Sequence, residues 1–275
     1  MAKQTNPFDL TGKVALVTGG ASGIGMAIAA AFVQSGARVL VGSRTQDKVE
    51  AAAKTLDGLR DDTGEDPVAG GIALDVTNDS SVERAVRKAV DLFGRLDILV
   101  NSAGAMLRKP TFELKCDDFT KIYETHVTGS LRCAQAAGHL FYEQHSGCII
   151  NLASISSFVD LIEVAAYASA KNAVIGLTRS LANEWAKHGI RTNAIAPGFI
   201  PTDINRKMIE GTERGRRIIE HTPMGRFGKA EEIAPAAVFL ASPAASFVNG
   251  HVLVVDGGYL ASGIGDATAP WVTEK

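Results

Sequence analysis

Residues 14–25 read VALVTGGASGIG, a short apolar run that leads directly into a glycine-rich turn and then into a predicted helix. Glycines let a backbone turn sharply and approach a phosphate closely, and the N-terminus of a helix stabilises the phosphate charge. The spacing is Gly-x3-Gly-x-Gly, which differs from the most common dinucleotide fingerprint. The order of strand, turn and helix still predicts a dinucleotide site. The residues expected at the cofactor are Gly19, Ser22, Gly23, Ile24 and Gly25.

The same alternation of apolar run and helix continues along the chain. Several runs are almost continuous in Val, Ile and Leu, which is typical of parallel strands covered by helices on both faces. The predicted strands are Val14–Val17, Arg38–Val41, Ile72–Leu74, Leu96–Asn101, Cys148–Leu152, Arg191–Ala196 and Val252–Val255. Helical spacing is found over Ile24–Phe32, Ser81–Phe93, Asp117–Gln144, Ala165–Lys187 and Glu231–Leu240. This pattern predicts an α/β fold, a doubly wound Rossmann-type domain with a central seven-stranded parallel sheet.

No composition break divides the 275 residues, so one domain is expected over 1–275, with a core at 10–258 and a C-terminal tail at 264–275. The net charge of −2 gives no reason to expect nucleic acid or an anionic membrane as a partner. No apolar run is long enough to span a bilayer, and the polar stretch Met1–Leu10 lacks the apolar core expected of a signal peptide. The three cysteines are too few and too widely spaced for a disulfide framework or a zinc site. We therefore expect a cytoplasmic protein without a metal.

The end of the second predicted strand indicates which dinucleotide binds. It reads Val41-Gly42-Ser43-Arg44, without the acidic residue that would bind the ribose 2′-hydroxyl of NAD. A guanidinium there can bind the 2′-phosphate of NADP and stack on the adenine. Ser43 and Arg44 therefore predict a preference for NADP, with NAD as a possible second cofactor. The alternative interpretation is a solvated arginine in a loop.

Three further residues have the spacing of an acid–base site. Tyr167 and Lys171 are four apart on a predicted helix and therefore project to the same side. A phenol with a pKa of about 10 is a poor base at neutral pH, and nearby positive charge lowers that pKa. Ser154 follows a predicted strand at the edge where open α/β sheets bind ligands, and it can hold the substrate oxygen. Ser154, Tyr167 and Lys171 are the predicted catalytic residues.

Several separate motifs occur in one order and spacing. They are Thr18–Gly25, Asn101-Ser102-Ala103-Gly104, Ser154, Tyr167-x3-Lys171, Pro197-Gly198 and Asp256-Gly257-Gly258. In these motifs the chain from Leu10 to Gly258 resembles the short-chain dehydrogenase/reductase family. The resemblance implies an NADP(H)-dependent oxidoreductase that moves a hydride between the nicotinamide and a secondary alcohol or its ketone.

The resemblance also implies roles for individual positions. Residues expected near the adenine are Asp75 and Val76, and those expected beneath the cofactor are Asn101 and Ala103. Ile200 and Thr202 would contact the nicotinamide. Members are often homotetramers that bury two long helices, which correspond here to Asp117–Gln144 and Ala165–Lys187.

One position departs from the family pattern. His126 stands where the family usually has an Asn, twenty-eight residues before the serine. In the family that Asn helps to hold a water chain that leads protons from the lysine to solvent. An imidazole nitrogen can also bind water, so His126 either takes part in the relay or only preserves the packing of its helix.

The substrate is less well defined. The segments around Thr202–Lys207 and Glu213–Arg217, and the ending Asp256–Gly263, resemble the group of family members that act on sugars, polyols and sugar acids. A substrate carboxylate could be bound by Arg108, Arg206 or Lys207, unless these residues form a solvated face. A less polar ketone would instead suit the apolar neighbours of the serine, which are Phe158, Val159 and Leu161.

Two other functions remain open. The first is a 3-oxoacyl thioester reductase, which uses the same chemistry on a different small-molecule substrate. The second is a catalytically silent NADP-binding regulator that uses the fold without the reaction. The presence of Ser154, Tyr167 and Lys171 together speaks against the regulator, because a silent protein needs none of them.

Overall fold

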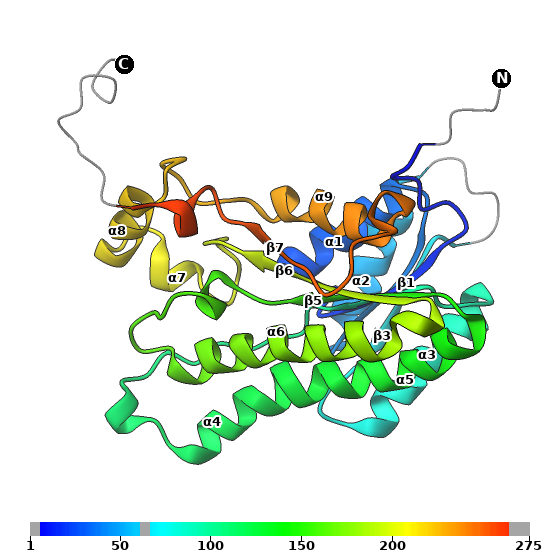
Figure 1. Cartoon of the computed structure of the whole chain (residues 1–275), viewed down its shortest axis with the longest axis horizontal. Coiled ribbons are helices and arrows are strands. Elements are labelled where there is room, and N and C mark those ends of the chain that lie inside the picture. The colour runs from blue at the N-terminus through cyan, green and yellow to red at the C-terminus, as the bar shows by residue number, and fades with distance from the viewer. Residues whose placement is uncertain (1–5, 61–66, 264–275) are drawn as a thin grey trace.

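The computed structural model describes residues 6–60 and 67–263, which form one domain around a single sheet (Figure 1). Its strand order is β3-β2-β1-β4-β5-β6-β7, and all neighbouring strands are parallel. The strands are β1 (Val14–Thr18), β2 (Arg38–Ser43), β3 (Ala69–Ala73), β4 (Ile98–Asn101), β5 (Gly147–Leu152), β6 (Ile190–Pro197) and β7 (Val252–Val255). The predicted seven-stranded parallel sheet is therefore confirmed.

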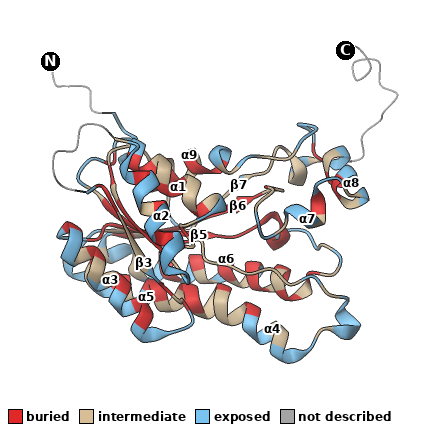
Figure 2. Ribbon diagram, turned by 180° about the vertical axis from the view of Figure 1, so that it is seen from behind, coloured by how far each residue is buried: buried red, intermediate tan, exposed pale blue. Residues whose placement is uncertain are grey.

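Helices cover both faces of this sheet, as Figures 1 and 2 show. One layer contains α1 (Gly23–Gln34), α2 (Gln46–Asp57) and α9 (Ala230–Ala241). The other contains α3 (Asp79–Phe93), α5 (Gly129–Gln144) and α6 (Ala165–Trp185). Along β1, Ala15 and Val17 pack in the first layer while Val14 and Leu16 pack in the second. Both faces are buried, which explains why the strands read as continuous apolar runs.

Strand β3 begins three residues earlier than the predicted Ile72–Leu74 and ends one residue earlier. Its first half contains Gly70 and Gly71, which lack the branched side chains typical of a strand. A Cβ at Gly71 would lie 2.5 Å from the backbone oxygen of Val49, because α2 packs directly on this strand. The glycine that hides the strand from sequence analysis is therefore required by the helix that covers it. Helix α2 is absent from the predicted helices.

The predicted helix Asp117–Gln144 is wrong as a single regular helix. It consists of α4 (Cys116–Tyr123), a π-helical turn at Glu124–Thr128, and α5. The backbone stays in the right-handed helical region at both junctions, so the axis continues while the hydrogen-bond spacing changes. His126 lies in this π turn.

The irregular segment after Pro197 contains two short helices, α7 (Arg206–Ile209) and α8 (Glu213–His221). Both follow the carboxyl end of β6 and project beyond the sheet (Figure 1). They cover the edge at which the strands end. The predicted tail at 264–275 lies outside the described residues.

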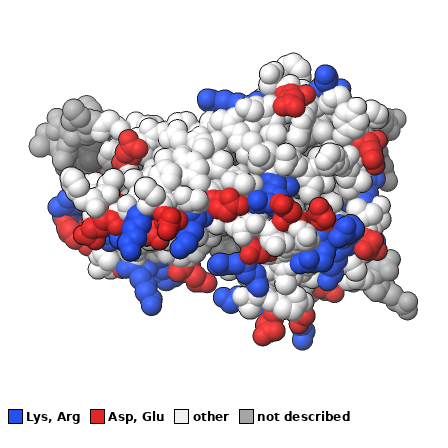
Figure 3. All heavy atoms as spheres, turned by 90° about the horizontal axis from the view of Figure 1, so that it is seen from below, with Lys and Arg blue, Asp and Glu red and all other residues white. Residues whose placement is uncertain are grey.

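The outer surface bears on the predicted partners. Figure 3 shows lysines and arginines side by side with aspartates and glutamates rather than gathered by sign. No described helix is long and apolar enough to cross a membrane. In the described part of the chain Cys116 is exposed, Cys133 and Cys148 are buried, and all three are free thiols.

The layer formed by α3, α5 and α6 depends on one aromatic side chain. Phe141 on α5 is fully buried, whereas Phe112 is fully exposed. We expect Phe141→Ala to lower the free energy of unfolding by about 3–5 kcal/mol, because it removes buried apolar contacts and leaves a cavity. Phe112→Ala is the control and should change it by less than about 0.5 kcal/mol. Urea denaturation measures both, and equal effects would contradict this account of the core.

Candidate active site

The glycine-rich turn lies against the end of β4. The hydroxyl of Thr18 accepts hydrogen bonds from the backbone N–H groups of Ser102 and Ala103, at 3.1 Å each. Gly19 has a φ of 68°, and a Cβ there would lie 2.9 Å from the backbone of Ala103. These contacts bring two of the predicted cofactor positions, Gly19 and Ala103, to the same edge of the sheet.

The N-terminus of α1 is open in the way that a pyrophosphate requires. Ser22 occupies the N-cap position, yet its side chain makes no capping hydrogen bond. Gly23 has a φ of 54°, and a Cβ at Gly25 would lie 2.4 Å from the backbone oxygen of Gly19. The methyl group of Thr202 would lie 3.2 Å from a Cβ at Gly23. These residues therefore form a close-packed backbone cradle that fits a dinucleotide phosphate.

The strand ends beside this cradle carry the residues predicted for the adenosine. Ser43 ends β2, Arg44 follows it, and Asp75 follows the adjacent β3. Arg44 is exposed and forms no salt bridge with any described residue. The pKa of Asp75 is lowered by hydrogen bonds from the backbone and side chain of Thr77, and further by the charge of Arg44. The positive charge beside this edge fits the 2′-phosphate of NADP.

A chain of buried polar side chains joins the strands beneath the site. Asn101 on β4 donates from Nδ2 to Oδ1 of Asn151 on β5 at 2.9 Å. Asn151 donates in turn to the hydroxyl of Thr178 on α6, also at 2.9 Å. Thr178 donates to the backbone oxygen of Val174. This chain fixes α6, which carries Tyr167 and Lys171, relative to the two central strands.

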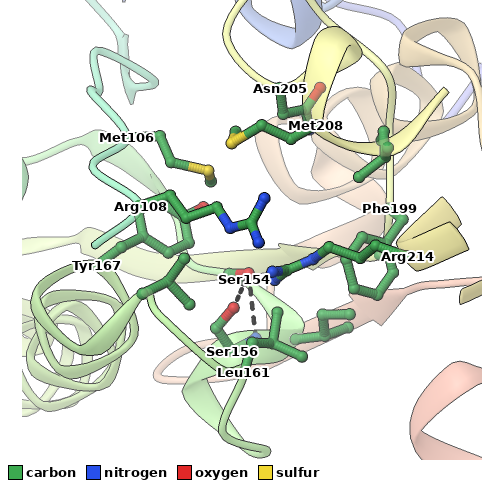
Figure 4. A pocket seen from close by; sticks show the side chains of 14 residues that line it. Met106, Arg108, Ser154, Ser156, Leu161, Tyr167, Phe199, Asn205, Met208 and Arg214 are labelled. Carbon is green, nitrogen blue, oxygen red and sulfur yellow. Dashed lines mark hydrogen bonds between the residues drawn. The ribbon is translucent and has the colours of Figure 1, made fainter. Parts of the chain in front are cut away.

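Ser154 and Tyr167 line the same pocket (Figure 4). Ser154 follows the end of β5 and caps a short 3-10 turn, with its hydroxyl accepting a hydrogen bond from the N–H of Ser156 at 3.1 Å. The hydroxyl of Ser156 lies 3.2 Å from that of Ser154. Two of the predicted catalytic residues are thus brought together, one from the segment after β5 and one from α6.

Lys171 lies behind Tyr167 on the same side of α6, as its spacing predicts. Its Nζ is 5.5 Å from the centroid of the Tyr167 ring and donates to the backbone oxygen of Leu152 at 2.5 Å. The side chain is buried, and this burial lowers its pKa to about 7. Lys171 therefore changes charge near neutral pH, unlike a lysine in water.

The chain alone does not lower the pKa of the phenol. Burial raises the pKa of Tyr167, and a hydrogen bond with Ser154 acts in the opposite direction. The expectation that Lys171 and an oxidised nicotinamide together lower this pKa stays a prediction, and in the protein by itself desolvation disfavours charge on both side chains.

His126 is buried against Tyr167, with the two ring centroids 5.4 Å apart at an angle of 86°. Its Nε2 lies 2.7 Å from the backbone oxygen of Ala105 and 3.1 Å from the nitrogen of that residue. In one tautomer Nε2 accepts from the N–H of Ala105, and in the other it carries a proton and donates to the Ala105 oxygen, which is the shorter contact. Nδ1 is then an acceptor, and it has no hydrogen-bond partner among the described residues. Burial, together with the charge of Lys171, lowers the pKa of His126 to about 3.

The pocket tests the residues predicted for the substrate. Arg108 and Leu161 line it. Arg206 lines a separate hollow, where it pairs with Glu210 at 2.9 Å. The described lining does not include Lys207, Phe158 or Val159.

Several lining residues were not predicted from the sequence, namely Met106, Phe199, Asn205, Met208 and Arg214. The only sequence signal for Arg214 is its place in the basic run after Glu213, and nothing there distinguishes it from Arg216 or Arg217. Ile200 is buried close to this region, and Thr202 reaches the N-terminus of α1 instead. The described residues contain no cluster of side chains that could hold a metal ion.

Comparisons with known proteins agree with this geometry. A family model described as enoyl-(acyl carrier protein) reductase matches residues 19–260. D-Threitol dehydrogenase of Mycolicibacterium smegmatis is 42% identical over 252 residues, which cover 92% of this chain and 94% of that protein. The 2-dehydro-3-deoxy-D-gluconate 5-dehydrogenase of Dickeya dadantii is 37% identical, with 93% and 98% covered.

A solved structure extends the similarity to three dimensions. The gluconate 5-dehydrogenase of Burkholderia cenocepacia, crystallised with NADP and tartrate, is 33% identical and superposes with a TM-score of 0.87. The similarity covers 94% of this chain and 98% of that chain.

The low pKa of His126 makes the protein less stable in acid. The unfolded imidazole has a pKa near 6.5, so its stabilising contribution is complete above that pH and is lost as pH falls towards 3. We expect His126→Asn to remove roughly 2 kcal/mol of the loss in unfolding free energy between pH 7 and pH 5. Urea denaturation at both pH values measures this difference. The exposed His251→Asn is the control, and an equal effect there would contradict the assignment.

Proposed function

Because the chain belongs to the short-chain dehydrogenase/reductase family, we propose that it is an NADP(H)-dependent oxidoreductase acting on a secondary alcohol or its ketone. The observation that carries the proposal is the meeting of Ser154 and Tyr167 in one pocket, with Lys171 packed behind the phenol. The substrate class is a sugar, polyol or sugar acid. This class is supported by the names of the relatives, which are a D-threitol dehydrogenase and dehydrogenases of gluconate or a gluconate derivative.

The chain's own residues divide the proton chemistry among them. When bound, the nicotinamide supplies or accepts the hydride. The hydroxyl of Ser154 holds the substrate oxygen, and Tyr167 gives that oxygen a proton in reduction or takes one in oxidation. The raised pKa of Tyr167 favours its protonated form, as reduction requires. Lys171 lies near enough to the ring for its charge to stabilise the phenolate that remains.

His126 belongs to this site as a neutral acceptor. Because its pKa is low, the His126 ring is uncharged near neutral pH, so it does not relay protons by becoming an imidazolium. Its free Nδ1 can instead accept a hydrogen bond from a water beside Lys171. This role keeps the ring in the proton path while its Nε2 is held by Ala105.

The cofactor assignment rests on residues at both ends of the cradle. Gly19, Ser22, Gly23, Ile24 and Gly25 would hold the pyrophosphate. Ser43 and Arg44 would hold the 2′-phosphate, which makes NADP preferred while NAD remains possible. The remaining contacts of the proposal are Asp75 and Val76 near the adenine, Asn101 and Ala103 under the ribose, Tyr167 and Lys171 at the nicotinamide ribose, and Ile200 and Thr202 at the nicotinamide.

A homotetramer is also part of the proposal. Helices α5 and α6 lie in one layer, and much of that side of the molecule carries no charged side chain (Figure 3). Such a surface suits contact with a second copy of the chain. A cytoplasmic location fits the exposed free thiol of Cys116, which a reducing compartment would preserve.

The second candidate is a 3-oxoacyl thioester reductase, which the description of the matching family model favours. The pocket speaks for the first candidate, because Arg108 and Arg214 suit a compact polar substrate. A silent NADP-binding regulator is the third candidate. It would not need Ser154, Tyr167 and Lys171 to be assembled at one site.

The charge after β2 generates a prediction on cofactor choice. Arg44→Asp replaces a cation by an anion that repels a 2′-phosphate and can bind a 2′-hydroxyl. We expect the ratio of kcat/KM for NADP over NAD to fall at least 100-fold, as measured by reduced-nicotinamide absorbance. Lys48→Asp is the control, because Lys48 is exposed and the same charge change there should leave the ratio unchanged. Arg38 is not used for this purpose, because it is the first residue of β2. An unchanged ratio in Arg44→Asp would refute the assignment.

The proposed function is tested by turnover of the purified protein with NADP(H) and a panel of polyols, sugars, sugar acids, simple ketones and a 3-oxoacyl thioester. We expect activity on one class of sugar, polyol or sugar acid, and a loss of at least 1,000-fold in Tyr167→Phe with cofactor binding retained. Tyr142→Phe, far from the pocket, should be fully active. Highest activity on the thioester would favour the second candidate. NADPH binding without any turnover would favour the silent regulator.

A further inference from the structure

Two arginines from distant parts of the chain enter the substrate pocket. Arg108 comes from the segment between β4 and α4, and Arg214 from the first turn of α8. Figure 4 shows both guanidinium groups directed into the pocket, on the side where Ser154 lies. The residues lining the pocket in the described structure include no aspartate or glutamate.

A single carboxylate, that of Glu163, lies close to both arginines. Glu163 accepts from Arg108 at 2.5 Å, and its Oε2 lies 4.0 Å from the nearest nitrogen of Arg214. Its position is set by the backbone, because its carbonyl oxygen accepts from the N–H of Lys109 at 2.7 Å. The cluster formed by Arg108, Glu163 and Arg214 therefore has one positive charge in excess.

Most of that excess falls on Arg214. Among the described residues Arg214 makes one hydrogen bond, a long one of 3.4 Å to the backbone oxygen of Ile162, and its nearest distance to Glu163 is 4.0 Å. A guanidinium has five N–H donors, so most of those of Arg214 remain available. Burial and the nearby charge of Arg108 lower the pKa of Arg214, because both make its positive charge less favourable. A bound anion would supply the missing compensation.

We propose that Arg214, assisted by Arg108, binds a carboxylate of the substrate, and that the enzyme acts on sugar acids in preference to neutral polyols. This inference rests on the proposed function, since it places the carboxylate in the pocket that contains Ser154 and Tyr167. Arg214 fixes the end of the substrate opposite the reacting carbon, and its planar fork matches a carboxylate in two parallel hydrogen bonds. It acts as a specificity residue and takes no part in proton transfer.

The neighbouring arginines of α8 provide a matched control. Arg216 pairs with both Glu213 and Glu220, and it does not line the pocket. It is two positions from Arg214 on the same short helix, so it shares the local backbone and much of the surrounding charge. A general electrostatic effect of removing an arginine from α8 would appear equally in Arg216→Gln.

The test compares D-gluconate, D-galactonate and L-threonate with the alditols that carry a hydroxymethyl group in place of the carboxylate. In the wild-type protein, kcat/KM for the best acid should exceed that for its alditol at least tenfold. Arg214→Gln should lower kcat/KM for the acid about 100-fold, mainly through KM, and change that for the alditol less than threefold. Arg214→Lys should recover part of the loss, and Arg216→Gln should behave as wild type.

Equal losses on acid and alditol in Arg214→Gln, or a wild-type preference for alditols, would overturn the carboxylate site while leaving the proposed function intact. Calorimetric titration of the same acids into the NADP-loaded protein provides a readout independent of turnover. If no compound is turned over but acids bind and Arg214→Gln abolishes binding, the proposed function fails and the carboxylate site stands. If acids neither bind nor react, the carboxylate site is wrong.

Discussion

The relative position of β4, β5 and α6 depends on the buried hydrogen-bond chain from Asn101 through Asn151 to Thr178. Buried amides are costly unless they are paired, and in this arrangement Asn101 and Asn151 both donate from Nδ2, while Oδ1 of Asn101 has no partner among the described residues. Ser154 lies two residues after the end of β5, and Tyr167 lies eleven residues before Thr178 on α6. The distance between the serine and the tyrosine in the pocket is therefore set from beneath, by residues that contact neither substrate nor cofactor.

Desolvation is the second factor that shapes the site. Burial shifts the pKa values of Tyr167, Lys171 and His126 in the direction that favours the neutral form of each. Charged side chains stand at the pocket wall, where Arg108 and Arg214 remain partly exposed. The buried side chains of the site therefore suit proton transfer, while the two arginines at the pocket wall attract an anion.

Much of this architecture could be predicted from local patterns. Strand β7 was predicted with its observed bounds, and the face shared by Tyr167 and Lys171 follows from helical spacing alone. Glycine-rich β3 escaped prediction because its composition is dictated by contact with α2, which no local pattern reveals. Arg214 escaped because its approach to Arg108 is fixed by tertiary packing across more than a hundred residues. The cofactor contacts and catalytic roles remain predictions.

The π turn at Glu124–Thr128 acts geometrically as one residue inserted into a helix, and it rotates everything after it by about 100°. Ile122, before the turn, packs on the Ala166 and Ala170 side of α6, whereas Phe141, after the turn, packs into the sheet. A straight α-helix of the same length could satisfy only one of these two surfaces. Deletion of a single residue from this turn would remove the rotation. The helix could then pack correctly against α6 or against the sheet, but not against both.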